Sequence, residues 1–379
     1  MIRGFKIRYM DNPGGGFGIA FVASHKGVVI DNNYIYEMKY WMNDCQGGGA
    51  DPTGGGISLF SSTNSVVSNN EIVKTGHHGI SVPGAKNVIV SGNKIHDYIV
   101  WGIDLSGDFQ APDNNLITGN TIYDLYQMDD GFHTGTCDVH TDFIFIRQGG
   151  GTRPQRTTIE KNLFYNNYNF SNSHGTAQIF TSFADNTVIR NNVFINPHSY
   201  FAISISWSSG DTQIYNNTLY TPRAAPIDLD IIGTNNRVKN NIAISNGNYL
   251  NIGSSTNLSV LTEDNYNVFI NNSVVSHVVS PSNYYSLSQW QSLGWDRNSV
   301  AVANISAIKF VNTSGYPTAC ETMDLRLQSG SPAIGAGVNL SSTGFTNDYA
   351  GIPRTGAWDI GAYKFYGLVP MVPGSINIK

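Results

Sequence analysis

Ionisable side chains are concentrated in one stretch of this sequence, between residues 129 and 156. His140 and Asp142 stand two positions apart in a strand-like segment, so both should face the same side. A group of acids, bases and cations at this density predicts a catalytic or ligand-binding site. Its members are Asp129, Asp130, His133, Asp138, His140, Asp142, Arg147, Arg153 and Arg156.

Glycoside hydrolysis is one reaction that fits these residues. It requires two carboxyl groups, one acting as acid and the other as base or nucleophile. Asp104 and Asp142 could supply them from successive strands, with Asp129 or Asp130 nearby.

β-Elimination from a uronate also fits. It needs a base that removes the proton beside the carboxylate, and cations that neutralise that carboxylate. His140 or Arg147 could be the base, and Arg153 and Arg156 the cations. An epimerase would use the same proton abstraction. The only cofactor indicated is Ca²⁺, which prefers oxygen ligands and could be held by Asp129, Asp130 and Asp142.

Alternating apolar and polar residues define a column of strands, at 77–82, 101–107, 138–148, 174–180, 201–207 and 226–232. Ile103 and Leu105 should point inward, so Asp104 should point outward. Parallel strands stack about 4.8 Å apart, which predicts a continuous polar strip. Trp41, Trp101 and Trp207 could stack on sugar rings. The substrate contacts we expect are His78, Trp101, Arg153, Arg156, Gln178, Trp207, Asp228 and Asp230.

Each of these residues also has a structural interpretation. A single aspartate on a strand surface usually interacts only with water. The segments His77–Gly79 and Asp129–Gly131 could be simple turns. Function is favoured where several unusual residues converge, as they do at Asp104, His140 and Asp142.

A short repeat positions these strands. Segments such as GVVIDNNYI and NVIVSGNKI place an asparagine between two apolar phases, at intervals of 23 to 42 residues. Asparagine suits a tight bend because its side chain bonds neighbouring backbone and tolerates left-handed conformations. The shortest intervals fit one coil of three short strands, and longer ones contain an inserted loop. The repeated residues are Asn33, Asn70, Asn93, Asn120, Asn162, Asn192, Asn217 and Asn241.

This pattern predicts an all-β fold, a parallel β-helix in which stacked coils place the asparagines in a buried ladder. An antiparallel hairpin protein is the alternative, but it would need Asn-Gly or Asp-Gly turns between paired strands, and these are scarce.

The repeats from Val28 to about Asn267 resemble the right-handed parallel β-helix proteins of the pectate-lyase-like class. Three C-terminal segments, 284–300, 323–337 and 348–365, resemble the closing part of many bacterial secreted β-helix proteins. Ser286 should cap a short amphipathic helix there, and the later segments should cover the open end of the coil. We expect coils over 1–270 and a C-terminal coil and cap over 271–379, packed on the same solenoid.

The resemblance implies a carbohydrate-directed protein but identifies no catalytic residue. The polygalacturonase-like set of NTD, DD, GHG and RIK is not present in that form. Only Asp129-Asp130 and His174-Gly175 match parts of it. The segment HTDFI resembles a strand of several carbohydrate-active β-helices, with Phe145 where glutamine is expected.

Composition excludes some alternatives. A net charge of −5 and 13% charged residues argue against a nucleic-acid partner, and no apolar stretch is long enough to span a membrane. Met1 is followed directly by the strand-like IRGFKI, so we expect an N-terminal part to be missing. Cys45, Cys137 and Cys320 could be three buried thiols, or one disulfide and a free thiol.

These observations favour an extracellular or cell-surface enzyme that cleaves a polysaccharide by hydrolysis or elimination. A non-catalytic carbohydrate-binding or adhesive protein is the second hypothesis, and a phage tail-spike-like protein the third.

Overall fold

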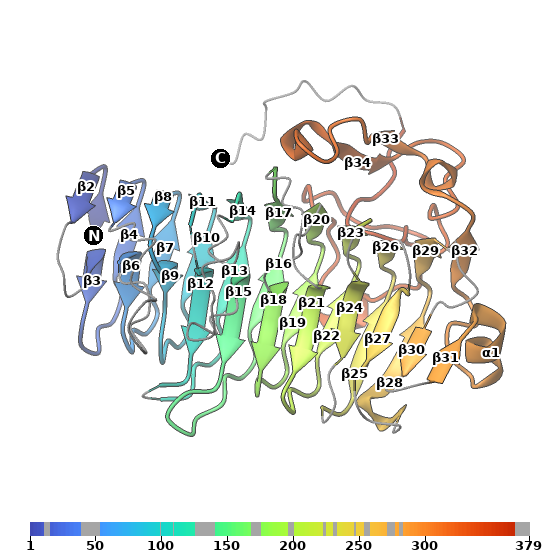
Figure 1. Ribbon diagram of the computed structural model, residues 1–379, viewed down its shortest axis with the longest axis horizontal. Coiled ribbons are helices and arrows are strands. Elements are labelled where there is room, and N and C mark those ends of the chain that lie inside the picture. Colours follow the sequence, from blue (N-terminus) through green and yellow to red (C-terminus); the bar gives the residue numbers. More distant parts are fainter. Residues whose placement is uncertain are drawn as a thin grey trace, which may run out of the picture.

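Three long parallel sheets dominate the structure (Figure 1). The computed structural model describes residues 1–10, 16–38, 54–98, 100–108, 110–125, 141–167, 176–195, 201–222, 225–229, 233–245, 248–253, 258–270, 277–279 and 283–367. In these ranges and up to β30, strands that follow one another in the chain belong to different sheets, and each pairs in parallel with its equivalent one coil away; beyond that point β31 pairs antiparallel with β30, and β33 with β34. The chain therefore winds through the three sheets in turn, which confirms the expected parallel β-helix. Such crossovers are almost always right-handed.

Each sheet takes one short strand from each successive coil. The first sheet contains β1 (Ile2–Arg3), β4 (Val29–Asp31), β7 (Val66–Ser68), β10 (Ile89–Ser91), β13 (Leu116–Thr118), β16 (Thr158–Glu160), β19 (Val188–Arg190), β22 (Gln213–Tyr215), β25 (Asn236–Lys239) and β28 (Leu261–Asn265). The second contains β2 (Lys6–Met10), β5 (Tyr34–Met38), β8 (Glu71–Thr75), β11 (Lys94–His96), β14 (Thr121–Tyr123), β17 (Leu163–Tyr165), β20 (Val193–Ile195), β23 (Thr218–Tyr220), β26 (Ile242–Ile244), β29 (Val268–Ile270) and β32 (Val300–Val302). The third contains β3 (Phe17–Phe21), β6 (Gly55–Leu59), β9 (His78–Ser81), β12 (Trp101–Ser106), β15 (Asp142–Arg147), β18 (Ala177–Ser182), β21 (Phe201–Ser206), β24 (Ala225–Leu229), β27 (Leu250–Ile252), β30 (His277–Val279) and β31 (Asn283–Tyr285).

One continuous apolar core fills the space between the sheets. The same inward position of the third sheet carries isoleucine in coil after coil, and each of these side chains is fully buried. Burying one such side chain stabilises the fold by about 1.5–3 kcal/mol, so the repeat itself supplies the core. The members are Ile57, Ile80, Ile103, Ile144, Ile179, Ile203 and Ile227.

The repeated asparagines form the expected buried ladder between the first and second sheets. The Nδ2 of Asn33 donates to the Oδ1 of Asn70, and this bond recurs in every coil at 2.9 to 3.2 Å. The same Oδ1 also accepts the backbone N–H of the preceding asparagine. The structure extends the ladder to Asn267, which receives the Nδ2 of Asn241.

Helix α1 (Leu287–Ser292) lies at the C-terminal end of the coils, at the right of Figure 1. Ser286 is its N-cap and forms a capping box with Gln289, as predicted. Trp290 is completely buried and belongs to the main core. One helix therefore covers the end of the solenoid.

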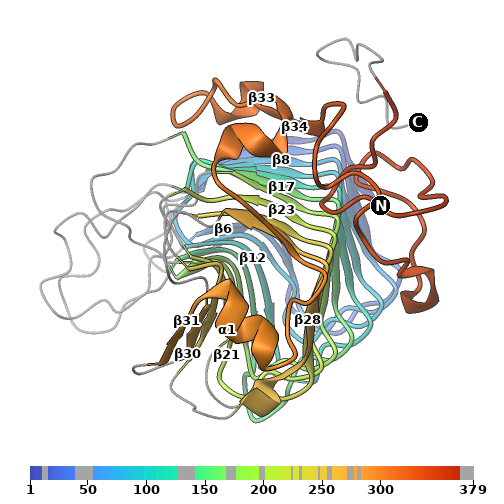
Figure 2. The ribbon, with the colours of Figure 1, turned by 90° about the vertical axis from the view of Figure 1, so that its right-hand side faces the viewer.

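The chain after β32 takes a different position from the one expected. It contains η3 (Ile305–Ile308), β33 (Phe310–Asn312), η4 (Cys320–Thr322), β34 (Asp324–Leu327) and η5 (Ser341–Thr343). It packs against the outer face of the second sheet, where Ile308, Leu325 and Ile360 join a separate apolar cluster (Figure 2). The expectation that segments 323–337 and 348–365 cover the open end is thus corrected. From β17 onward the second sheet carries outward apolar residues, such as Ile195 and Ile244, which need this cover.

Two further expectations concern cysteine and membranes. Cys320 is a buried free thiol, and Cys45 and Cys137 lie outside the described residues. Among the described residues, no helix has the length and apolarity to cross a membrane.

Candidate functional site

The outward face of the third sheet carries the residues on which the sequence analysis depends. The register aligns Ser81, Asp104, Phe145, Phe180, Ser204, Asp228 and Asn251 in one row. The predicted inward positions of Ile103 and Leu105 are confirmed by their complete burial. The strip is not continuously polar, however, because two phenylalanines interrupt it.

Strand β12 breaks the usual alternation of inward and outward side chains, because two consecutive residues point inward. Gly102 points into the core together with Ile103, so Trp101 and Asp104 both point outward. A Cβ atom at Gly102 would lie only 2.6 Å from the carbonyl oxygen of Phe143 and 2.9 Å from the side chain of Ile122. Only glycine fits this position without displacing backbone, which fixes the orientation of the tryptophan.

Arg147 bridges two carboxyl groups on this face. Its Nε lies 3.1 Å from Asp104 and its Nη2 lies 3.0 Å from Asp108. Asp104 is 1% exposed, and burial raises the pKa of its carboxyl group to about 6, although Arg147 opposes the shift. The Asp108 side chain is 34% exposed. We call Asp104 and Asp108, which Arg147 bridges, the acidic pair.

His78 lies beside the acidic pair, with its Nε2 3.6 Å from a carboxylate oxygen of Asp104. Burial lowers the pKa of His78 well below its usual value, with His77 and Arg147 contributing. The imidazole is therefore neutral, and the contact is not an ion pair. Both ring nitrogens are buried without a hydrogen bond to any described residue. A neutral, unbonded imidazole next to a protonatable carboxyl group can accept a proton.

An aromatic platform adjoins these groups. The rings of Trp101 and Phe145 have centroids 5.1 Å apart, and Phe145 stacks on Phe180 at 5.1 Å. The guanidinium of Arg147 lies 5.5 Å from the centre of the Trp101 ring. Phe145 and Phe180 are each only 4% exposed and form a buried apolar cluster, against which the partly buried Trp101 packs.

A second polar group lies beyond the platform. Ser204 donates to Asp228 at 3.1 Å, and Asn251 donates to the same carboxylate. Asp228 stands four strands away from Asp104 in register, which corresponds to roughly 19 Å. The two carboxylates are too far apart to act on one glycosidic bond.

Asp142 does not stand directly beside Asp104. Its register partner is Trp101, whereas Phe145 is the partner of Asp104. The two aspartates are therefore offset by three residues, roughly 10 Å along the strand. The carboxylate of Asp142 is completely buried and accepts the backbone N–H of Ala177 at 2.9 Å.

Gln178 does not lie on the outward face at all. It is completely buried at the position equivalent to Phe143, a core residue. Neither its amide nitrogen nor its amide oxygen has a hydrogen-bond partner among the described residues. This corrects the expectation that Gln178 contacts substrate, because the strand irregularity turns this position inward.

Three other expected contacts lie at the corner that leads to the first sheet. Arg153 pairs with Asp185, and Arg156 pairs with Asp113. Trp207 follows β21 and is 57% exposed. The remaining candidates lie outside the described residues, and with them two of the three proposed Ca²⁺ ligands. They are Trp41, Asp129, Asp130, His133, Asp138, His140 and Asp230.

The sequence analysis missed Asp108, Phe145 and Phe180 as members of the site. Asp108 follows Asp104 by four residues, so a strict alternation extended past the strand would have identified it. The two phenylalanines occupy outward positions of an alternating pattern, yet each is only 4% exposed because they pack on one another.

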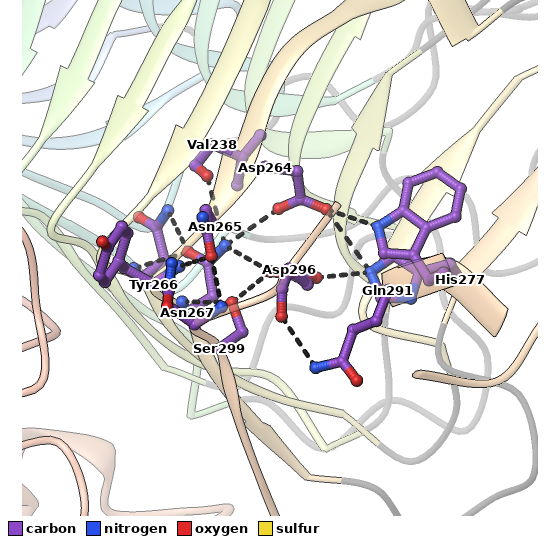
Figure 3. A network of polar contacts seen from close by, with 12 residues as sticks. Val238, Asp264, Asn265, Tyr266, Asn267, His277, Gln291, Asp296 and Ser299 are labelled. Carbon is purple, nitrogen blue, oxygen red and sulfur yellow. Dashed lines mark hydrogen bonds and ion pairs between the residues drawn. The ribbon is translucent and has the colours of Figure 1, made fainter. Parts of the chain in front are cut away.

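A second ionisable group is buried at the C-terminal end of the solenoid. Asp264 of β28, His277 of β30 and Asp296, which follows α1, all have side chains with no exposed surface. Figure 3 shows both carboxylates facing the imidazole, whose Nε2 lies 2.9 Å from Asp296 and 3.6 Å from Asp264. We call these three residues the terminal cluster. Nothing in the sequence connects them, because they meet only through the fold.

Protein donors occupy every carboxylate oxygen of the terminal cluster. The amide of Asn267 donates to both aspartates, and Trp290 Nε1 donates to Asp264 at 3.0 Å. Ser299 donates to the Oδ1 of Asp296. Burial raises the pKa of Asp264. Burial would lower the pKa of His277, but the hydrogen bonds that its imidazole donates to the two carboxylates outweigh this effect and raise it. The three ligand atoms lie within 4.8 Å of one another, but these donors already explain the arrangement as a charge network.

Comparisons with known proteins agree with the architecture. Residues 6–137 match the family model described as right handed beta helix region. The fold is a right-handed parallel β-helix. No curated protein sequence matches the chain.

Several solved structures resemble this β-helix at low sequence identity. The A-module of the Azotobacter vinelandii mannuronan C-5 epimerase AlgE6 has a TM-score of 0.52 and 12% identity over 74% of this chain. XylC in complex with xylose has a TM-score of 0.50 and 13% identity over 90%. Pectate lyase Pel9A has a TM-score of 0.51 and 17% identity over 96% of this chain and 86% of its own. The chain spans 65% of the epimerase module and 60% of XylC.

Proposed function

We propose that the chain is an extracellular enzyme that cleaves a polysaccharide bound along the outward face of the third sheet. The observation that carries this proposal is the bridge that Arg147 makes between two carboxyl groups in unequal surroundings. Asp104 is buried with a pKa of about 6, whereas Asp108 is partly exposed. A carboxyl group that retains its proton beside a second carboxylate is the arrangement that glycoside hydrolysis uses.

The roles follow from these environments. Asp104 donates its proton to the glycosidic oxygen as the carbon–oxygen bond breaks. Asp108 accepts a proton from the water that adds to the anomeric carbon, or attacks that carbon first. Arg147 keeps both carboxyl groups oriented, and the partly buried Trp101 contacts the sugar ring.

The charge of this face favours a neutral polysaccharide. With Asp104 protonated as the acid, Arg147 balances the charge of Asp108, and Asp228 stands four strands away. A uronate carboxylate would therefore find no unpaired cation among these described groups, whereas a neutral glycan needs none.

Elimination is the second candidate, and His78 is the observation that favours it. A buried neutral imidazole whose ring nitrogens bond to no described residue is a suitable base for proton abstraction. In that reaction Arg147 would have to release an aspartate to receive a substrate carboxylate.

The fold comparisons support the substrate class only. Pel9A is a pectate lyase, AlgE6 is a mannuronan epimerase and XylC was solved with xylose. All three names concern sugars or their polymers, which agrees with a polysaccharide on this face of the third sheet.

New reducing ends, measured with a panel of neutral and uronate polysaccharides, test the proposal. We expect cleavage of a neutral polymer that is lost in Asp104→Asn and Asp108→Asn and retained in Asp113→Asn, which alters a surface ion pair at a different corner. Cleavage should fall as the pH rises above about 6, because Asp104 must be protonated to act as the acid. Ultraviolet absorbance from an unsaturated product that disappears in His78→Ala would select elimination. Binding without cleavage of any polymer would replace the enzyme with a carbohydrate-binding protein.

A further inference from the structure

Two bulky aromatic residues occupy a corner position that holds serine, glycine or glutamine in earlier coils. Phe183 and Trp207 follow the third-sheet strands of adjacent coils, and the backbone N–H of Phe183 donates to the carbonyl of Trp207 at 3.1 Å. In register, the same position holds Ser61, Gly84, Gly107 and Gln148 in earlier coils. The rings of Phe183 and Trp207 stack with centroids 6.3 Å apart.

The backbone at this corner is left-handed at each of these residues. The φ angle is 53° at both Phe183 and Trp207, and 62° at Ser208. Glycine adopts such angles freely, whereas a bulky side chain does so only at an energetic cost. Left-handed residues recur at the corners of this solenoid, for example at Asn69, Lys74 and Lys161, so the distinctive feature here is the pair of aromatic side chains rather than the backbone angle.

Arg153 completes a shelf against the two rings. Its guanidinium lies 5.7 Å from the centre of the Phe183 ring. Asp185 receives its Nε and Nη2, and Nη2 also donates to the carbonyl of Ser208 at 2.7 Å. Its Nη1 makes no hydrogen bond to any described residue, while the side chain is 33% exposed. The arginine is fixed in place with one donor group left over.

An exposed ring and a fixed, unused donor are the two elements that recognise a pyranose. The Trp207 ring is 57% exposed and offers a flat apolar surface for the C–H face of a sugar. Arg153 Nη1 offers N–H groups for a hydroxyl oxygen at the edge of that ring. Because Asp185 neutralises Arg153, the shelf has no net charge to attract an anion.

We propose that Phe183, Trp207 and Arg153 form a glycan-binding subsite on the corner of the solenoid, separate from the acidic pair, for a neutral sugar residue of a polysaccharide. Its role is to hold polymer on the protein surface. The subsite does not depend on the proposed reaction, because it shares no residue with the acidic pair.

Affinity electrophoresis of the full chain in gels that contain soluble neutral polysaccharides tests this subsite. All variants carry Asp104→Asn, so that the polymer is not consumed. We expect Trp207→Gly to weaken retention by about tenfold or more, as loss of an exposed tryptophan contact does. Glycine accepts the left-handed backbone, so thermal unfolding should stay unchanged or shift upward. Tyr284→Ala, which removes a tyrosine that is 58% exposed on β31, should leave retention unchanged.

Several outcomes would overturn the subsite. Equal retention of Trp207→Gly and its parent would do so, as would the absence of retention by every polymer. A lower unfolding temperature without weaker binding would make the aromatic pair structural. Self-association of the parent that Trp207→Gly abolishes would assign the shelf to contact between two copies of this chain. A subsite that binds while the wild-type chain cleaves nothing would contradict the proposed reaction and leave this inference standing.

Discussion

The acidic pair and the terminal cluster are built from the same residue types, but they satisfy their polar atoms to different degrees. In the terminal cluster, all four carboxylate oxygens of Asp264 and Asp296 accept bonds from protein donors. Beside the acidic pair, both ring nitrogens of His78 are buried without a hydrogen bond to any described residue. Buried polar groups are normally paired, so unused capacity on the outward face, beside other ionisable groups, indicates function, whereas full pairing indicates structure.

The charge states differ in the same way. The two carboxylates raise the pKa of His277, whereas burial lowers the pKa of His78 and keeps it neutral. The cation beside the acidic pair is Arg147, which remains charged at any working pH. A histidine whose charged form is favoured by two acids stabilises the fold, and a neutral histidine beside an acid of pKa about 6 can exchange protons.

Removing one acid of the terminal cluster should have the largest effect on stability. Asp264→Ala leaves Trp290 and His277 without their partner in a fully buried site, and breaking such a network costs about 3–5 kcal/mol. Urea denaturation would measure the loss. The matched control is Asp324→Ala, which removes a partly exposed pair with Arg326 and should cost less than about 1 kcal/mol. Equal losses of unfolding free energy in the two variants would contradict the claim that the terminal cluster stabilises the fold more than a surface ion pair does.

The corresponding change in the acidic pair should affect activity and spare stability. Asp104→Asn removes the transferable proton, which should lower kcat/KM by about 10²- to 10⁴-fold. The amide is neutral and similar in shape, so it suits the buried position and unfolding should change by less than about 1 kcal/mol. The kcat/KM of the variant and its unfolding free energy in urea, measured on the same preparation, test the two expectations. An Asp104→Asn variant that unfolds easily but retains activity per folded molecule would show that this pair is structural as well.

Stability should decrease as the pH rises, through the terminal cluster. The folded pKa of His277 is raised, so its contribution is complete below about pH 6.5, its unfolded value, and is lost as the pH passes the folded pKa. The folded pKa of Asp264 is also raised, which likewise makes the folded state less stable as the pH rises above about 4. Unfolding free energies at pH 5.5 and pH 9 should differ by about 1–3 kcal/mol. The difference should shrink in His277→Gln, and an unchanged pH dependence there would assign the effect to other groups.

The repeat made the fold predictable, whereas the sites depend on details that the repeat does not encode. Alternation and the asparagine spacing determined the coils, the inward isoleucines and the ladder, because every coil repeats the same local rules. Gln178 turns inward at the position equivalent to Gly102 and Phe143, where each strand breaks its alternation, which the pattern cannot anticipate. The terminal cluster could not be predicted, since Asp264, His277 and Asp296 share no motif spacing and meet only where the coils end.

The smallest effect should come from the inner side of the strand that carries Phe180. Gln178 is completely buried and neither amide atom bonds to a described residue, which costs free energy that an apolar side chain would not. Gln178→Leu should therefore stabilise the fold by about 1 kcal/mol and leave cleavage unchanged, because the side chain faces the core. Urea denaturation and the reducing-end assay measure the two quantities. Phe180→Leu, two residues further along the same strand, shortens a side chain that is 4% exposed and stacks on Phe145, so it should do the opposite and destabilise the fold by about 1–2 kcal/mol. If Gln178→Leu reduced cleavage, the unpaired amide of this buried residue would have a role in the reaction. Unpaired polar atoms would then indicate function inside the core as well as on the outward face, and the comparison would fail.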